Sequence, residues 1–130
     1  MDENDYFSIK TVPYIEMDWI YVDAKKILLI VIGHVENTDE FLLIKQYRPP
    51  FGKWVVSAPM GAFPKGSIEE LIDIAKKEAE GEVGYKIKHI EPLTAIARSC
   101  GLTNEIAYLY KAEYFDQVSE QHLHPEEEIK

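Results

Sequence analysis

Two glutamates in the second half of the chain have the spacing of a metal-binding pair. Glu78 and Glu82 lie four residues apart in the segment SIEELIDIAKKEAEGEVGY, which begins at Ser67. On a helix, this spacing places both carboxylates on one face, about one turn apart. Two carboxylates so close repel each other unless a cation lies between them, and hard divalent ions such as Mg²⁺ prefer oxygen ligands. The pair therefore indicates either a divalent-cation site or a solvated acidic helix face.

The element that must position this pair is a helix expected over residues 68–80. Ser67 and Glu70 have the spacing of a capping box, which marks the start of a helix. Gly81 and Gly84 are expected to end it. Apolar residues recur at three-to-four spacing and predict a buried stripe, formed by Ile68, Leu71, Ile72, Ala75 and Ala79.

Strands are predicted on both sides of this helix. Residues 7–22 are expected to form one or two strands, residues 26–35 a strand buried on both faces, and residues 41–47 its hairpin partner. The other strands are expected at 54–58, 85–97 and 105–115, and the loops at 59–66 and 98–104. Several strands with one helix predict the α/β class, as an α+β sandwich with a mixed sheet, in a single domain over residues 1–130.

Composition restricts the partners and the compartment. The net charge of −9 disfavours nucleic acid, and a phosphate-bearing substrate would need a metal ion or a local cluster of Arg and Lys. The single cysteine, Cys100, allows no intrachain disulfide and fits a reducing compartment. The acidic N-terminus lacks the regions of a signal peptide, and the longest aliphatic run, 27–32, is too short to span a bilayer. We therefore expect a cytoplasmic protein that binds neither nucleic acid nor membrane.

Residues 61–85 resemble the Nudix box, G-x5-E-x7-R-E-U-x-E-E-x-G-U, where U is aliphatic or aromatic. Glu78 and Glu82 take the places of the key glutamate and the last glutamate, whereas Gly81 stands where the family has another glutamate. Gly61 corresponds to the opening glycine if two residues are inserted in the loop 62–67. The remaining matches are Lys77 at the arginine, Ala79 at the first U, Gly84 at the last glycine and Tyr85 at the final U.

Other runs resemble the ADP-ribose pyrophosphatases of this family, in the same order along residues 40–130. KQYRPP, GKW and APMG, between residues 45 and 61, are similar to the family's Q-Y-R-x-P, G-x-W and E-L-P-A-G. SCGLTNE at 99–105 is similar to S-P-G-x-T-x-E, and PEEEI at 125–129 resembles an acidic loop. The resemblance implies a Nudix-like mixed sheet and an enzyme that uses Mg²⁺ or Mn²⁺ to cleave the pyrophosphate of a nucleoside diphosphate derivative, with ADP-ribose the leading substrate.

The resemblance also implies roles for individual residues in such a site. In the family, the box helix binds one to three divalent cations, which polarise the pyrophosphate and activate a water. Glu78 and Glu82 would then be metal ligands with a catalytic role, and the backbone carbonyl of Gly61 would be a further ligand. Glu127, or its neighbour Glu126, either supplies a catalytic loop carboxylate or is only solvated charge.

Four residues are candidates for substrate contact. Arg48 either binds a substrate phosphate, since guanidinium matches phosphate oxygens, or forms a surface ion pair. Trp19 and Trp54 either stack on adenine or pack in the core. Glu105 either orients a metal-bound group or only closes its loop. Cys100 has no nucleophile motif around it and is expected to be a small packed side chain.

Departures from the family pattern leave the function open. Gly81 removes a ligand, and Ser57 stands where many relatives have Glu. The chain ends at Lys130, where relatives continue with a strand and a helix, so the sequence is either truncated or closed by other means, such as a partner chain. Because relatives are dimers that exchange N-terminal strands, we expect a homodimer with residues 7–22 at the interface. The alternatives to an attenuated enzyme are a non-catalytic Nudix-fold module that binds a nucleotide or a protein, and an unrelated acidic α+β domain.

Overall fold

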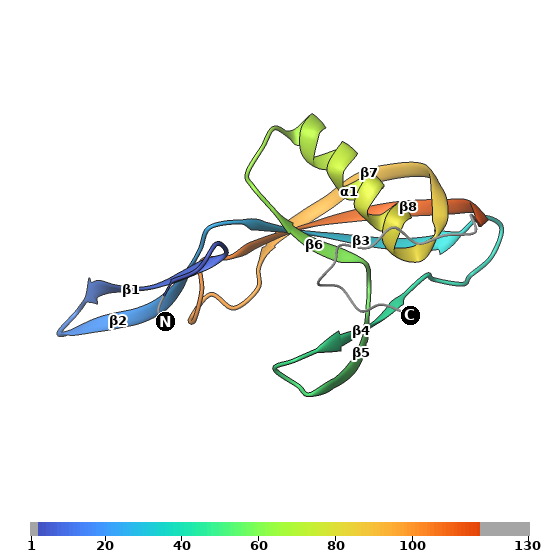
Figure 1. Ribbon diagram of the computed structural model, residues 1–130. Helices are drawn as coiled ribbons and strands as arrows, with labels where there is room; N and C mark the ends of the chain where they lie inside the picture. Colours follow the sequence, from blue (N-terminus) through green and yellow to red (C-terminus); the bar gives the residue numbers. More distant parts are fainter. Residues whose placement is uncertain (1–2, 118–130) are drawn as a thin grey trace.

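A four-stranded mixed sheet forms the centre of the computed structural model, which describes residues 3–117 (Figure 1). Its strand order is β6-β3-β8-β7, with β3 parallel to β8 and the other neighbours antiparallel. Two separate hairpins, β1-β2 and β4-β5, complete the strands. The elements are β1 (Phe7–Tyr14), β2 (Met17–Ala24), β3 (Ile27–Val35), β4 (Ile44–Arg48), β5 (Lys53–Ser57), β6 (Met60–Phe63), α1 (Ile68–Val83), β7 (Tyr85–Ala97) and β8 (Ile106–Gln117). This arrangement confirms the predicted α/β class with a mixed sheet.

Strand β3 lies inside the sheet because its sequence is apolar on both faces. Ile27, Leu29 and Val31 belong to the core that packs against α1. Leu28 is also buried, and strand alternation places its side chain on the opposite face. A strand buried on both faces was predicted for this segment and is confirmed. Between residues 3 and 117, no helical segment combines the length and the apolar character that a bilayer span requires.

Helix α1 packs across one face of the sheet, as Figure 1 shows. Leu71, Ala75 and Ala79 are buried in the core, as predicted, whereas Ile68 is 71% exposed, contrary to prediction. The predicted capping box is present: Ser67 Oγ accepts from the Glu70 backbone N–H at 3.2 Å, and a Glu70 carboxylate oxygen accepts from the Ser67 backbone N–H.

The predicted end of the helix is wrong by three residues. Gly81 lies inside α1 and is buried, and the helix ends instead at Gly84, whose φ is 74°. Only glycine adopts this left-handed conformation readily, and its N–H bonds back to the Glu80 carbonyl at 3.0 Å. Gly81 lacks the positive φ of a cap, so the helix continues through it and carries Glu82 into the core.

The predicted hairpin between residues 26–35 and 41–47 is wrong except at its start. Phe41 forms a bridge with His34, and the Leu42 N–H donates to the Gly33 carbonyl. Beyond that point, β6 occupies the same edge of β3, pairing Met60–Phe63 with the segment that begins at Ile27. Strand β4 therefore leaves the sheet and pairs with β5. The segment 59–66, expected to be a loop, contains β6.

The β1-β2 hairpin extends away from the sheet (Figure 1) and is fastened by the loop between β7 and β8. The Val22 N–H donates to the Leu102 carbonyl at 2.7 Å. The Asn104 side chain accepts from the Ala24 N–H at 2.8 Å and donates to the Asp23 carboxylate at 2.6 Å. These bonds hold the hairpin, predicted as strands over 7–22, at the end of the sheet where β3 and β8 begin.

Candidate active site

Glu82 is a fully buried carboxylate at the C-terminal end of α1. Its side chain has 0% exposure, and its Oε2 accepts a hydrogen bond from the Met60 backbone N–H at 3.2 Å. A buried carboxylate is costly unless hydrogen bonds or a cation offset the loss of water. The bond from Met60 fixes Glu82 against the first residue of β6.

Glu78 lies against the next residue of the same strand. A Cβ atom built on Gly61 would lie 3.5 Å from Glu78 Cγ and 2.7 Å from Phe63 Cε2. Gly61 is therefore required by close approach to Phe63, with which a side chain there would collide, and it lies within contact distance of Glu78. Consecutive residues of β6 thus contact both glutamates, and the structure brings together the three predicted metal ligands, Glu78, Glu82 and Gly61.

The donor set at this place fits a hard divalent cation. Two carboxylates and the backbone of β6 supply oxygen atoms, which Mg²⁺ and Mn²⁺ prefer over nitrogen or sulfur. Gly81, buried beside Glu82, adds no side-chain ligand. Within residues 3–117, no group of three or more His, Cys, Asp and Glu side chains has the geometry of a metal site. Glu78 and Glu82 therefore offer two carboxylate ligands, whereas the family pattern has a third carboxylate at the position of Gly81.

Two other charged residues of α1, Glu80 and Lys77, do not join the acidic pair. The Glu80 carboxylate accepts from the Ile87 backbone N–H at 2.8 Å, so it joins the helix to β7. Lys77, which takes the place of the box arginine, is exposed and forms no ion pair within the described part of the chain. The helix is held by the Glu80 bond and by its apolar stripe.

Glu105 closes its own loop. Its carboxylate pairs with Arg98 Nη1 at 2.8 Å, and its side chain is only 11% exposed. Its backbone N–H also donates to the Thr103 hydroxyl. The structure therefore shows the loop-closing alternative for Glu105, while a role toward a metal-bound group stays a prediction.

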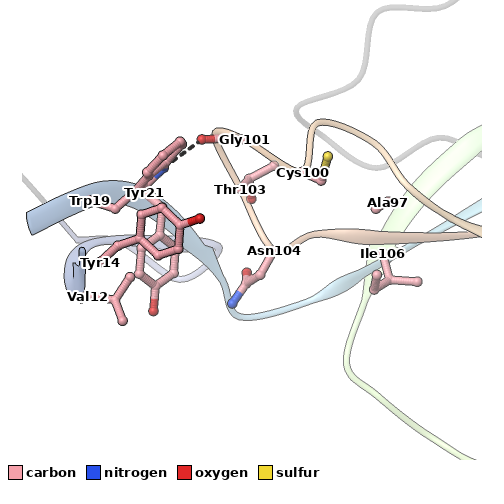
Figure 2. Close-up of a pocket in the computed structure, with 10 residues that line it drawn as sticks. All are labelled: Val12, Tyr14, Trp19, Tyr21, Ala97, Cys100, Gly101, Thr103, Asn104 and Ile106. Carbon is pink, nitrogen blue, oxygen red and sulfur yellow. Dashed lines mark hydrogen bonds between the residues drawn. The ribbon is translucent and has the colours of Figure 1, made fainter.

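A cavity of about 630 Å³ lies between the β1-β2 hairpin and this loop (Figure 2). Tyr14, Trp19 and Tyr21 line it from the hairpin, and Cys100 and Asn104 line it from the loop. The indole N–H of Trp19 donates to the Gly101 carbonyl at 2.9 Å, and its ring meets Tyr14 edge-on with centroids 5.8 Å apart.

Two expectations for the cavity residues need correction. Trp19 was expected either to stack on adenine or to pack in the core, and at 40% exposure it does not pack in the core. Cys100 was expected to be a packed side chain, but it is exposed in the turn between β7 and β8. The physical reason is that this turn projects from the sheet to meet the hairpin, and its residues face the cavity.

Trp54 and Arg48 lie on the other hairpin, β4-β5. Trp54 pairs with Tyr47 across the strands, with ring centroids 6.0 Å apart in an edge-on arrangement. Arg48 is half-buried at the end of β4, and no ion pair joins it to another residue between 3 and 117. Neither lines the cavity at Trp19. Glu127 and Glu126 lie outside the described residues.

Two residues near the acidic pair, Met60 and Tyr114, were not among the residues predicted for the site. Met60, expected in a loop, provides the backbone N–H for Glu82. Tyr114 is fully buried in the core beneath the C-terminal part of α1. The alternation of apolar residues along 106–117 would have placed Tyr114 on the helix-facing side of its strand together with Tyr110 and Ala112.

Known proteins resemble the chain over much of its length, although no protein-family model matches it. The ADP-ribose pyrophosphatase of Bacillus subtilis is 34% identical over 100 residues, which are 77% of this chain and 53% of that protein. The methanol dehydrogenase activator of Bacillus methanolicus is 35% identical over 83 residues, 64% of this chain and 44% of that protein. An uncharacterised Nudix hydrolase of Schizosaccharomyces pombe is 36% identical over 83 residues, 64% of this chain and 38% of that protein.

The chain thus spans about half the length of the curated relatives it matches. The Bacillus subtilis and Schizosaccharomyces pombe relatives carry the names that the motifs had indicated, and the mixed sheet with its single helix agrees with them. The expected family resemblance is confirmed: the chain is related to the Nudix hydrolases of the ADP-ribose pyrophosphatase type, and its box carries Gly81 in place of one glutamate.

Proposed function

We propose that the chain forms the catalytic part of a Mg²⁺- or Mn²⁺-dependent hydrolase that cleaves the pyrophosphate of a nucleoside diphosphate derivative, with ADP-ribose as the leading substrate. The observation that carries the proposal is the contact of consecutive β6 residues with two glutamates. Met60 holds the buried Glu82, and Gly61 lies against Glu78. Two carboxylates one turn apart on one helix face are suited to share a single hard cation.

In this site, Glu78, Glu82 and the Gly61 carbonyl would hold the cation. A bound divalent cation supplies a Lewis acid for the phosphate oxygens and lowers the pKa of a bound water. In the net reaction a water oxygen bonds to one phosphorus, and the bridging oxygen leaves with the other phosphate. ADP-ribose and water then give AMP and ribose 5-phosphate. We assign Arg48 to a substrate phosphate, because its guanidinium has no carboxylate partner among residues 3–117.

The cavity at Trp19 is the proposed site of the substrate's aromatic base. Aromatic side chains from the hairpin line it, and planar bases stack on such rings. Leu29 pairs with Gly61 on one side and with Tyr108 on the other, so Gly61 and Tyr108 are two strand spacings apart, about 10 Å. Ile106, two residues before Tyr108, lines the cavity. The extended length of a nucleoside diphosphate suits the separation between the proposed cation site at Gly61 and the cavity at Trp19.

A homodimer is part of the proposal. The β1-β2 hairpin exposes apolar side chains that a monomer would leave in water, namely Phe7, Ile9, Val12, Tyr14, Ile15, Met17, Trp19 and Ile20. Clustered exposed apolar surface of this kind marks association sites. We therefore propose that two chains associate through this hairpin, in a reducing, cytoplasmic compartment that keeps the exposed Cys100 as a thiol.

The second candidate is a Nudix-fold module that binds a nucleotide or a protein without turnover. Gly81 favours it, because the site then has two carboxylate side chains instead of three. The resemblance to a protein named methanol dehydrogenase activator also favours it, since that name describes an effect on another enzyme.

Chromatography of ADP-ribose incubated with the chain separates the two candidates. The enzyme proposal expects AMP in the presence of Mg²⁺ or Mn²⁺, none with EDTA, and about a hundredfold less with Glu82→Gln. Asp73→Asn, a change at an exposed residue of the same helix, is the control and should leave the rate unchanged. A folded wild type that binds the metal but releases no AMP would favour the binding module.

A further inference from the structure

Tyr114 of β8 is a buried tyrosine whose hydroxyl has no hydrogen-bond partner among residues 3–117. Its exposure is 0%, and its hydroxyl forms no hydrogen bond with any residue in the described range. A buried hydroxyl without a hydrogen bond is unfavourable, and phenylalanine would fill the same space without that penalty. The hydroxyl therefore calls for a role outside core packing.

The backbone around Tyr114 fixes the direction of its ring. Tyr114 pairs with Val35 of β3 and with Ile87 of β7. A Cβ atom on Gly33 would lie 2.3 Å from Tyr114 Cε2, so the ring lies directly over a position where only glycine fits. Tyr85 packs edge-on against the ring, with centroids 6.4 Å apart. Enclosed in this way, the ring belongs to the core under α1.

The helix end above this ring carries the buried acidic residues. Tyr114 shares one core with Ala75 and Ala79, and Glu82 follows Ala79 by one helical turn. Burial raises the pKa of Tyr114, and the nearby carboxylates of Glu82 and then Glu80 raise it further. The phenol is therefore protonated and can donate a hydrogen bond.

Of these two carboxylates, Glu80 already accepts a hydrogen bond from the backbone of β7. Its Oε2 accepts the Ile87 backbone N–H at 2.8 Å and thereby joins α1 to β7. Glu82 instead has its Oε2 directed to Met60 on the side of the proposed cation site. A ligand carboxylate needs its orientation fixed by outer hydrogen bonds, and such partners tune the affinity for the metal.

We propose that Tyr114 is a positioning residue for Glu82. Its hydroxyl donates through one ordered water to the Glu82 carboxylate and holds it in the orientation that binds a divalent cation. Gly33 serves the same purpose by leaving room for the ring. The proposal rests on the divalent-cation site of the proposed function, and it adds a residue from β8 to a site built on α1 and β6.

Tyr114→Phe tests this because it removes only the hydroxyl. Calorimetric titration with Mn²⁺ and urea unfolding in EDTA are measured on the same proteins. We expect Tyr114→Phe to bind Mn²⁺ about tenfold more weakly or worse, while its unfolding midpoint in EDTA stays the same or rises. Tyr110→Phe is the matched control, since Tyr110 is buried on the same strand and face, and it should leave Mn²⁺ affinity unchanged.

The possible failures have different signatures. If wild type binds Mn²⁺ and Tyr114→Phe binds it equally well, the role of Tyr114 is overturned while the metal site stands. If Tyr114→Phe loses stability and affinity together, or if Tyr110→Phe weakens binding as much, the hydroxyl has a packing role and the inference is overturned. A wild type that binds no Mn²⁺ overturns the proposed function and this inference together.

Discussion

The Met60 backbone N–H donates to Glu82 Oε2 at 3.2 Å, which joins the first residue of β6 to the last glutamate of α1. This bond orients a fully buried carboxylate, and the next strand residue, Gly61, lies against Glu78. Strand β6 is short and carries a glycine, yet it contacts both glutamates. The proposed chemistry therefore depends on the register of β6 against β3 as much as on the helix.

Gly81→Glu should make stability depend on metal. Gly81 is helical, so a glutamate there escapes the strain of a left-handed cap and gains helix propensity. Its burial, however, adds a second unscreened carboxylate beside Glu82. We expect the melting temperature to fall in EDTA and to recover to the wild-type value or above with Mg²⁺.

The same variant tests the chemistry of the missing ligand. A third carboxylate should tighten metal binding and raise Mg²⁺-dependent turnover of ADP-ribose. Gly81→Ala, which restores helix propensity without a ligand, is its control. Equal melting behaviour of Gly81→Glu in EDTA and in Mg²⁺ would show that position 81 does not face the cation site.

Gly33→Ala should destabilise the fold through Tyr114. The added Cβ would lie 2.3 Å from Tyr114 Cε2, so the ring or the strand must move. Such overpacking costs about 1–3 kcal/mol, measured as a lower free energy of unfolding in urea. Gly101→Ala is the control, because a Cβ there meets nothing within 4 Å. Equal stability of the two variants would contradict the described position of the ring.

Asn104→Ala should loosen the β1-β2 hairpin. The pKa of Asp23 is lowered, mainly by its hydrogen bond with Lys10 and next by its hydrogen bond with Asn104. These contacts therefore stabilise the hairpin at pH values above the ordinary pKa of an aspartate, and the stabilisation is lost as the pH falls through the lowered pKa. We expect the pKa of Asp23, followed by NMR, to rise toward its ordinary value in Asn104→Ala, with faster amide exchange at Ala24. Unchanged titration of Asp23 would mean that the hydrogen bond from Asn104 to Asp23 is absent in solution.

Trp19→Ala should weaken nucleotide binding. Aromatic stacking contributes about 0.5–1.5 kcal/mol, so AMP affinity measured by calorimetry should fall by roughly two- to twelvefold. Phe51→Ala, on the other hairpin and 70% exposed, serves as the control. If both variants bind AMP like wild type, the cavity in Figure 2 is not the base site.

The hairpin's role in assembly can be tested at the same exposed strand. Ile20 is 65% exposed on β2, and Ile20→Lys would place a charge in the proposed interface. We expect light scattering to give a dimer for wild type at micromolar concentration and a monomer for this variant. Leu93→Lys, at an exposed residue of β7, should stay dimeric. A monomeric wild type would reject the dimer.

Local sequence signals predicted the elements whose structure is decided locally. The capping box at Ser67, the apolar run of β3 and the bounds of β7 were all found as expected, because each depends on neighbouring residues. The hairpin at 41–47 was wrong because β6 competes for the same edge of β3, which is a non-local contact. The end of α1 was placed too early because either glycine could cap a helix, and only tertiary packing selects Gly84.

The candidate site was predictable in part for the same reason. Glu78, Glu82 and Gly61 were found from spacing and resemblance, and the structure brings them together. The burial of Glu82, the Met60 bond and the position of Tyr114 all arise from strand register, which has no signature in a single segment. Cys100 was misplaced because the docking of its turn on the β1-β2 hairpin depends on residues about eighty positions away, such as Asp23.

Calorimetric titration of the wild-type chain with Mg²⁺ and Mn²⁺, beside Glu78→Gln and Asp73→Asn, tests the metal site most directly. We expect binding at millimolar concentration or tighter for wild type and for Asp73→Asn, and a loss of about tenfold or more for Glu78→Gln. Asp73 is exposed on the same helix, so its variant controls for net charge. Equal binding by Glu78→Gln and wild type would place the metal elsewhere and contradict the proposed cation site at Glu78 and Glu82.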